Sequence, residues 1–500
     1  MKPIGEIVKQ KPIVGWMLFV GTIIIVFLLG LLASSIIERR AEALFAYTPQ
    51  VEHEQWEPRN EVWGENFPRQ YESYMQTADT TFESKHNGAK KKDMLAEIPE
   101  MVVLWAGYPF SKEYNQGRGH YWAIKDVQDI LRTGAPMEEK SGPMPGTCWA
   151  CKSPDVPRLM KEKGIAEFYK STWAELGDEV VNHIGCADCH DAKTMDLHIT
   201  RPALIEAFQR QGRNIAEATH QEMRSLVCAQ CHVEYYFKGE GKYLTFPWDK
   251  GFSMEDMEAY YDEIQFADWT HSLSKTPMIK AQHPDYEIFM MGVHYDRGVS
   301  CADCHMPYKS EGGMKFTNHH IQSPLNNVAN TCQVCHREET EKLVQNVYDR
   351  QDKVIENRTK LEKLLAKAHI EAKFAWDKGA NDKQMEAALK HIRAAQWRWD
   401  YSAASHGASF HAPLETSRII AHGIEKAQEA RLEIARVLAN LGYNQEVPMP
   451  DISTKEKAQA YIGLDMKTLN SEKKTFLEQI VPEWLKRAKE RESTYPVKNL

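Results

Sequence analysis

Mainly α-helical structure with little β is the fold class that the sequence predicts, and two features of the chain predict it. The segment after residue 336 consists of long amphipathic stretches with apolar side chains at helical spacing. Residues 101–336 are rich in turns, such as Pro143-Met144-Pro145-Gly146, and contain few long periodic stretches and no regular repeat. We therefore divide the 500 residues into an N-terminal segment 1–46, a linker 47–100 leading into the domain, a main domain 101–336 and a helical region 337–500.

The N-terminal segment carries an apolar run from Val14 to Ile37 with basic residues on both sides. The run is long enough to span a bilayer, whereas a cleavable signal usually has an apolar region of about 7–15 residues ending in small side chains. Ala33-Ser34-Ser35 is small but lies inside the run. We interpret the run as an uncleaved signal anchor, with a cleaved signal peptide as the alternative. The basic N-terminal flank places the rest of the chain on the far, periplasmic side of the membrane.

Residues 47–100 are polar and contain proline, which is typical of a linker. The formal net charge of −8 argues against nucleic-acid binding. An anionic substrate would need a local positive pocket that overrides this mean field.

The main domain uses all ten cysteines of the chain in five Cys-x-x-Cys pairs. Four pairs are followed directly by histidine and the first is followed by lysine. Cys-x-x-Cys-His is the attachment signature of c-type haem, in which both thiols bind the porphyrin and the next side chain is the proximal iron ligand. The sequence thus predicts five covalent haem c groups on these pairs: Cys148/Cys151 with Lys152, Cys186/Cys189 with His190, Cys228/Cys231 with His232, Cys301/Cys304 with His305, and Cys332/Cys335 with His336.

Structural zinc and disulfides are alternatives for paired cysteines. Zinc ribbons need no histidine directly after the second cysteine, and five pairs do not divide evenly into four-thiolate sites. A disulfide across a two-residue loop gains little closure entropy. Covalent haem therefore explains the pattern better, and it also requires the far side of the membrane.

Lys152 distinguishes the first haem site from the others. A lysine binds iron only as a neutral amine, so the metal must displace a proton from a group whose free pKa is ~10.4. An unusual proximal ligand favours catalysis, whereas bis-histidine haems have no open position and suit electron transfer. The alternative is an ordinary haem site that lost its histidine, in an electron-transfer cytochrome without a substrate site.

The sequence of the C-terminal region predicts long helices. Leu343, Val347, Val354, Leu361, Leu365, Ala368 and Ala372 form a heptad-like seam that Gly379 ends. Further helices are predicted at about 383–405 and 414–440, with shorter ones after Ser453 and Ser471. The seam could pack inside its own bundle or form an interface.

Three strings, GTCWACKSPDVPRL, CAQCHVEYYF and SLSKTPMIKAQHP, resemble cytochrome c nitrite reductase, the ammonia-forming pentahaem enzyme. The likeness extends from about Arg118 into the C-terminal helices. It implies a multihaem cytochrome c domain that reduces nitrite to ammonium with six electrons at a Lys-ligated haem, fed by four bis-histidine haems. A sister enzyme acting mainly on hydroxylamine or sulfite fits the same open iron.

The resemblance also implies distal ligands, which spacing alone cannot choose. His120 would serve the haem at Cys228/Cys231, and His319 the one at Cys186/Cys189. His411 would serve Cys301/Cys304, and His294 would serve Cys332/Cys335. His320 and His406 are the histidines most easily mistaken for ligands.

On the open face of the Lys152 haem, the resemblance implies three catalytic side chains, Arg132, Tyr235 and His283. Nitrite is an anion and its N–O cleavage needs protons, which a permanent charge, a phenol and an imidazole can supply. The resemblance further implies one calcium ion, bound by Glu234, Gln282 and the carbonyls of Tyr235 and Lys280, all hard oxygen ligands.

The resemblance finally implies two partners for the chain. One is a membrane-anchored, quinol-oxidising multihaem cytochrome as electron donor. The other is a second copy of the chain, in a homodimer built on the C-terminal helices.

Overall fold

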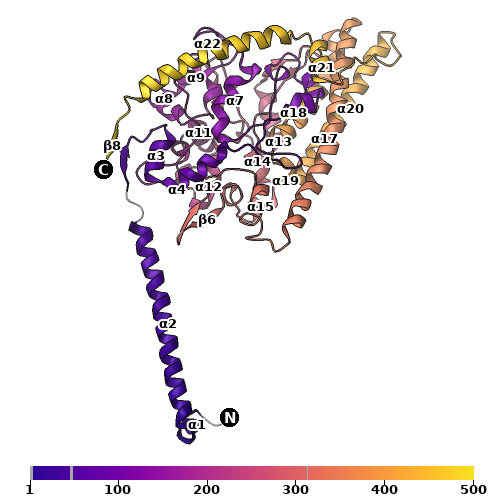
Figure 1. Ribbon diagram of the computed structural model, residues 1–500. Coiled ribbons are helices and arrows are strands. Elements are labelled where there is room, and N and C mark those ends of the chain that lie inside the picture. Colours follow the sequence, from indigo (N-terminus) through magenta and orange to yellow (C-terminus); the bar gives the residue numbers. More distant parts are fainter. Residues whose placement is uncertain (1–3, 46–48, 312) are drawn as a thin grey trace.

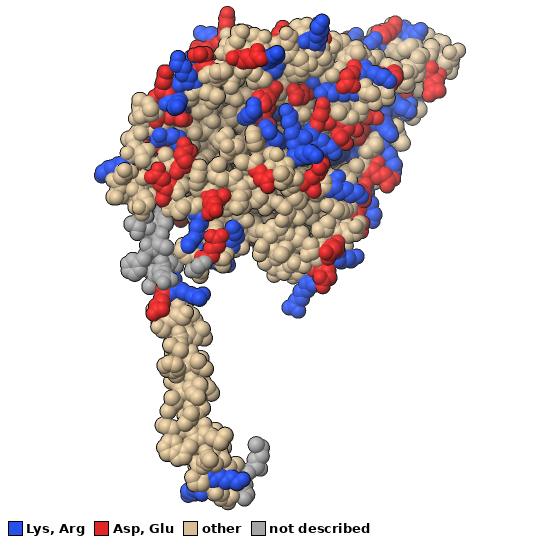
Figure 2. Space-filling model, viewed as in Figure 1, with Lys and Arg blue, Asp and Glu red and all other residues tan. Residues whose placement is uncertain are grey.

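The computed structural model describes residues 4–45, 49–311 and 313–500. Helix α1 (Ile4–Gln10) and the long helix α2 (Pro12–Phe45) extend away from the body of the molecule (Figure 1). The predicted apolar run lies inside α2, whose residues Pro12–Arg40 form a 29-residue stretch apolar enough to cross a membrane. Figure 2 shows this rod almost free of charge along its length. The predicted boundary between residues 46 and 47 lies outside the described residues.

Strands are few and short, and they form two-stranded antiparallel ladders. In one ladder, Val51 pairs with Asn499, so the segment after α2 lies beside the C-terminus. The ladders are β1 (Val51–His53) with β8 (Val497–Asn499), β2 (Tyr236–Lys238) with β3 (Tyr243–Thr245), β4 (Trp269–Thr270) with β5 (Pro277–Met278), and β6 (Tyr308–Glu311) with β7 (Met314–Thr317). Helices contain 57% of the residues and strands 7%, which confirms the mainly α class.

Short helices are the main regular elements of residues 60–305. Side-chain caps set some of their starts: Thr219 begins α12 and Ser253 begins α13, each in a reciprocal capping box. The predicted linker, residues 47–100, contributes α3 to α5 and the buried Trp63. The short helices are α3 (Asn60–Asn66), α4 (Pro68–Met75), α5 (Met94–Glu97), α6 (Glu100–Leu104), α7 (Ala123–Asp129), α8 (Asp155–Lys163), α9 (Ile165–Lys170), α10 (Cys186–Cys189), α11 (Pro202–Arg210), α12 (His220–Ala229), α13 (Met254–Glu263), α14 (Asp285–Met290), α15 (Val293–Asp296) and α16 (Cys301–His305).

Three long helices form one side of the body (Figure 1): α17 (Thr340–Asp377), α18 (Asp382–Ala404) and α20 (Pro413–Asn440), with the short α19 (Ala408–His411) between the last two. Their bounds confirm the predicted helices, and Gly379 follows α17 with φ +93°. The seam residues from Val347 to Ala372 are buried within this single chain, where α17 packs against α18, α20 and α6. The seam is thus used inside its own bundle.

The last two helices are α21 (Lys455–Tyr461) and α22 (Met466–Glu492). The prediction of a short helix after Ser471 is wrong at its start and in its length. Asp465 caps α22 by accepting from Thr468 N–H at 3.1 Å, so the helix begins five residues earlier and runs for 27 residues through Pro482.

A buried histidine pair joins α17 to the loop after β4. The rings of His271 and His369 stack with centroids 3.7 Å apart. His369 lies 2.6 Å from the Gln396 amide oxygen and 2.9 Å from the Ser274 hydroxyl, and His271 donates to the Val103 carbonyl at 2.8 Å. Burial lowers the pKa of His369 to about 4 and lowers the pKa of His271 well below its ordinary value. Both rings are therefore neutral in the folded protein at neutral pH.

This pair predicts acid lability. As pH falls below about 6.5, these two histidines bind protons in the unfolded chain but not in the folded chain. The free energy of unfolding therefore declines until the pH reaches the pKa of the folded state. For His369 the loss is on the order of 3 kcal/mol. His369→Phe keeps the stacked ring but cannot titrate, so it should lower the melting temperature at pH 7.5 and flatten its decline between pH 7.5 and 5. The exposed His422→Phe is the matched control, and equal slopes in all three proteins would contradict this account.

Candidate functional site

One large cavity runs through the body and is lined by all ten cysteines. Its volume is about 1930 Å³. Pockets for single small molecules usually measure about 300–1,000 Å³. The five cysteine pairs, far apart in sequence, therefore face one shared space that is large enough for several cofactors.

Helical turns orient each Cys-x-x-Cys-His motif toward the cavity. In three of them the histidine N–H donates to the carbonyl of the first cysteine, as in His190 to Cys186 at 3.0 Å, His232 to Cys228 at 2.9 Å and His336 to Cys332 at 2.8 Å. This i to i+4 spacing places the first thiol and the imidazole on one helix face. The first motif differs: Lys152 N–H bonds to the Trp149 carbonyl at 2.9 Å, because the chain there forms a tighter 3₁₀ turn, Gly146–Trp149.

The four motif histidines each face the distal histidine that the resemblance assigned to them. A metal–imidazole bond is about 2 Å long, so two imidazoles on one metal have ring centres about 6 Å apart. The ring centroids are separated by 6.4 Å for His120–His232, 6.1 Å for His190–His319, 6.3 Å for His305–His411 and 6.3 Å for His294–His336.

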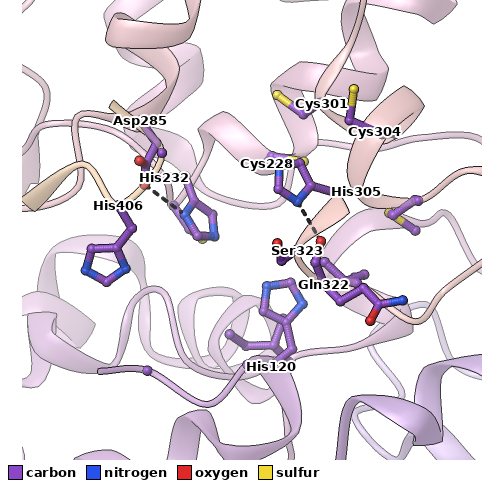
Figure 3. Close-up of a pocket in the computed structure, with 18 of the residues that line it drawn as sticks. His120, Cys228, His232, Asp285, Cys301, Cys304, His305, Gln322, Ser323 and His406 are labelled. Carbon is purple, nitrogen blue, oxygen red and sulfur yellow. Dashed lines mark hydrogen bonds and ion pairs between the residues drawn. The ribbon is translucent and has the colours of Figure 1, made fainter. Parts of the chain in front are cut away.

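Hydrogen bonds at Nδ1 leave the other ring nitrogen of several histidines for the cavity. His305 Nδ1 lies 2.8 Å from the Gln322 carbonyl, and His190 Nδ1 lies 2.9 Å from the Met195 carbonyl. His232 Nδ1 is 3.5 Å from the Asp285 carboxylate (Figure 3). Such second contacts fix the tautomer and the ring orientation of a metal-binding histidine.

Burial keeps the distal imidazoles neutral, which is the form that binds a metal. Burial lowers the pKa of His120 to about 3, with the nearby His232 adding to the shift. It lowers the pKa of His319 and His411 to about 4. These rings therefore need no proton release to bind iron at neutral pH.

Lys152 lines the same cavity as Arg132, Tyr235 and His283. Burial lowers the pKa of Lys152. The charge of Arg132 lowers this pKa further, whereas the neighbouring thiols raise it. Burial lowers the pKa of His283 well below its usual value, with Lys152 contributing, and raises the pKa of Tyr235. The structure thus brings the predicted catalytic side chains to one cavity, in which Arg132 carries a permanent charge.

His320 and His406, the two histidines most easily mistaken for ligands, also line the cavity. His406 lies near Asp285 (Figure 3), and its ring centroid is 6.4 Å from that of His283. Burial lowers the pKa of His406 and that of the half-buried His320. Neither ring forms one of the four opposed pairs described above.

Among the predicted calcium ligands, Glu234 has a fully buried carboxylate. Its oxygens accept from Tyr261 O–H at 2.9 Å and from Gln282 N–H at 2.6 Å, and the Gln282 side-chain amide lies 3.2 Å from the Lys280 carbonyl. The Lys280 amine is 2.8 Å from Asp400, and no ion pair to Glu234 occurs within the described residues. A buried carboxylate with neutral donors and nearby carbonyls fits a hard cation.

Two residues at the site escaped the sequence analysis. Asp285 orients His232, and it also accepts from the Ser405 hydroxyl at 2.7 Å. The buried Arg201 pairs with Asp188 beside Cys189 and donates to the carbonyls of Ala150 at 2.6 Å and Ser153 at 2.9 Å, on both sides of Lys152. Their partners are distant in sequence, so no local pattern marks them.

Fold and cavity together define a multihaem c-type cytochrome. The family model of cytochrome c552 matches residues 59–493. Cytochrome c-552 from Bacteroides fragilis is 64% identical over 482 residues, covering 96% of this chain and 98% of the relative. Cytochrome c-552 from Maridesulfovibrio salexigens is 46% identical and covers 93% of both chains. The chain belongs to the cytochrome c552 family.

A solved structure extends this relationship. The catalytic subunit of cytochrome c nitrite reductase from Desulfovibrio desulfuricans, which has two calcium sites, aligns with a TM-score of 0.73 and 31% identity. The alignment covers 87% of this chain and 96% of that subunit. The resemblance predicted from the three motif strings is confirmed.

Proposed function

We propose that the chain is an ammonia-forming nitrite reductase that converts nitrite to ammonium with six electrons. The observation that carries the proposal is that Lys152, Arg132, Tyr235 and His283 line one cavity with ten cysteines and four opposed histidine pairs. The relationship to a cytochrome c nitrite reductase supports the choice of nitrite.

Five haem c groups would be held by the five cysteine pairs. Four would take two imidazoles each, and the fifth would take the Lys152 amine on one face and substrate on the other. When bound, these groups supply an electron path and an open iron position for nitrite. The common cavity supports this assignment, because all five motifs line it.

The side chains near Lys152 divide the remaining work. Burial favours the neutral Lys152 amine that a metal can bind. Arg132 supplies the charge that attracts nitrite into an acidic protein, and its planar donor fork suits two oxygens. His283 and Tyr235 donate and pass protons at the substrate oxygens, whose departure as water requires protonation.

Calcium would bind between Glu234 and Gln282, with the carbonyls of Tyr235 and Lys280 as further ligands. The ion would offset the cost of burying the Glu234 carboxylate, since burial raises the pKa of this group well above its usual value. Because Tyr235 and His283 neighbour these ligands in sequence, the ion would hold both in register.

The proposed location is the periplasmic face of the inner membrane, with α2 as an anchor, or the soluble periplasm if α2 is removed. The exposed apolar surface of α2 supports a membrane contact. An anchored enzyme could take electrons from a membrane quinol-oxidising multihaem cytochrome. After cleavage of α2, the enzyme would no longer need to lie in the same membrane as this electron donor.

A homodimer built on the C-terminal helices is also proposed, as the resemblance implies. Leu414, at the start of α20, is 87% exposed and offers apolar surface for such a contact. The buried seam of α17 does not contribute to this argument.

Anaerobic turnover tests the proposed function. Purified holoenzyme with nitrite and a reduced viologen should form one ammonium for every six electrons consumed. Hydroxylamine and sulfite, tested in parallel, should turn over more slowly at equal concentration. Electron uptake without ammonium would contradict the proposal and favour a cytochrome without a substrate site.

Replacing Lys152 tests the catalytic haem. The wild-type protein should contain five covalent haems, four low-spin and one high-spin. Lys152→His should retain all five but change the high-spin spectrum and lower turnover, because a different proximal ligand alters the electron density at the open position. Five low-spin haems in the wild type, or full activity in the variant, would show that Lys152 is incidental.

Calcium removal should lower activity without releasing haem, because the ion supports Tyr235 and His283 and not the thioether bonds. Activity and haem absorbance are measured before chelation, after chelation and after calcium is restored. Glu234→Gln should mimic the chelated state. Full turnover in a demonstrably calcium-free sample would remove this site from the mechanism.

Arg132→Ala should raise the nitrite KM and lower kcat/KM at least about tenfold, as expected when a hydrogen bond from a charged group is lost. Hydroxylamine, which is neutral near pH 7, should be affected less. The matched control is Arg213→Ala, since Arg213 also lies on a phenylalanine ring, 4.2 Å from Phe208, but is exposed. Equal penalties for both substrates would make Arg132 a structural residue.

A further inference from the structure

The turn that carries Arg132 is only three residues long, a 3₁₀ turn from Leu131 to Thr133. Gly134 follows with φ +74°, a backbone conformation that glycine adopts without strain. At the start of the turn, Leu131 N–H donates to the Glu113 carboxylate at 2.8 Å. A turn this short has almost no internal stabilisation, so its position depends on contacts from other elements.

The C-terminal helix α22 supplies the contact on the other side of the turn. Lys473 is 4% exposed, and its amine donates to the Gly134 carbonyl at 2.7 Å and to the Thr133 hydroxyl oxygen at 3.1 Å. The Thr133 hydroxyl is itself buried and lies 2.9 Å from the carbonyls of Val127 and Ile130. Its proton is thus used there, and its lone pair is available to Lys473.

Lys473 is charged at neutral pH despite its burial. Burial lowers its pKa to about 8, and the carboxylates of Glu113 and Asp129 oppose that shift. A charged donor makes hydrogen bonds roughly twice as strong as a neutral one. The contact between α22 and the turn is therefore one of the strong polar contacts of this region.

Arg132 has few restraints of its own. Its guanidinium lies 4.5 Å from the Phe110 ring centroid, and within the described residues no hydrogen bond or ion pair fixes it. The side chain is left available for an anion. Its placement then depends on the Phe110 ring and on the backbone turn to which Glu113 and Lys473 are bonded.

We infer that Lys473 is a positioning residue that holds the Arg132 turn for anion binding. This inference rests on the proposed function, because it assigns the purpose of the contact to nitrite recognition. A lysine that served only the stability of α22 would affect all substrates alike. A lysine that acts through Arg132 should affect anions and lose its effect when Arg132 is absent.

Lys473→Met tests the inference in the holoenzyme, because methionine fills similar space but provides neither charge nor hydrogen bonds. The neighbouring Lys474→Met is the control, since the Lys474 side chain is 75% exposed. We expect Lys473→Met to raise the nitrite KM, and the nitrite Kd of the oxidised enzyme, about tenfold. The hydroxylamine KM should change less than about twofold, and the haem content should be unchanged.

A double-mutant cycle with Arg132→Ala isolates the coupling. In the Arg132→Ala background, Lys473→Met should raise the nitrite KM no further. An equal increase in both backgrounds, or an equal increase for hydroxylamine, would overturn the inference in favour of a structural role. If Arg132→Ala alone leaves nitrite binding unchanged, the proposed role of Arg132 fails first and the inference falls with it.

Thr133→Val provides a second variant should Lys473→Met fail to incorporate haem. It removes one acceptor of Lys473 while leaving the charge and the Gly134 contact in place. We expect a nitrite KM about threefold higher, again only when Arg132 is present. No change in nitrite affinity would overturn the inference.

Discussion

The placement of ten thiols around one cavity is the constraint on which the rest of the structure depends. Each cysteine motif must direct two thiols and the following side chain to the same side, which one helical turn achieves. Five such turns around a space of about 1930 Å³ leave no room for long helices or sheets at the centre. Long helices are therefore displaced to one side, where α17, α18 and α20 bury their apolar faces against each other. The short helices and small ladders follow from the cofactor geometry and not from weak helix propensity.

Burial then sets the charge state of the groups that face this cavity. It keeps imidazoles such as His120 and His319 neutral, and it shifts Lys152 toward the neutral amine. The same desolvation would remove charge from any histidine or lysine meant to attract an anion. Arginine best resists the loss of its charge in such a place, because its free pKa exceeds about 12. The proposed division between neutral ligands and a cationic Arg132 thus follows from the low dielectric of the cavity.

Local patterns made the helices and the cysteine motifs that line the cavity predictable from the sequence, because a motif or an apolar period fixes neighbours within one turn. Distal histidines could be proposed only through resemblance, since spacing does not reveal that His319 lies opposite His190. Asp285 left no local signal, because its partner is distant in sequence. The seam of α17 was visible, but whether it packs within the chain or between chains depends on helices that follow it. The start of α22 was missed because the cap of Asp465 was not recognised.

The C-terminal helix α22 connects both sides of the Lys152 site. Lys473 contacts the turn of Arg132, while Trp484 packs 5.4 Å from Trp173, which stacks on Trp149 at 4.8 Å within the first cysteine motif. A substrate held between a proximal ligand and a distal cation is sensitive to their separation, and displacements near 1 Å are costly in catalysis. Neither segment is long enough to fix that separation by itself. A single 27-residue helix contacts both segments and links them, so the site depends on residues more than 300 positions away in the chain.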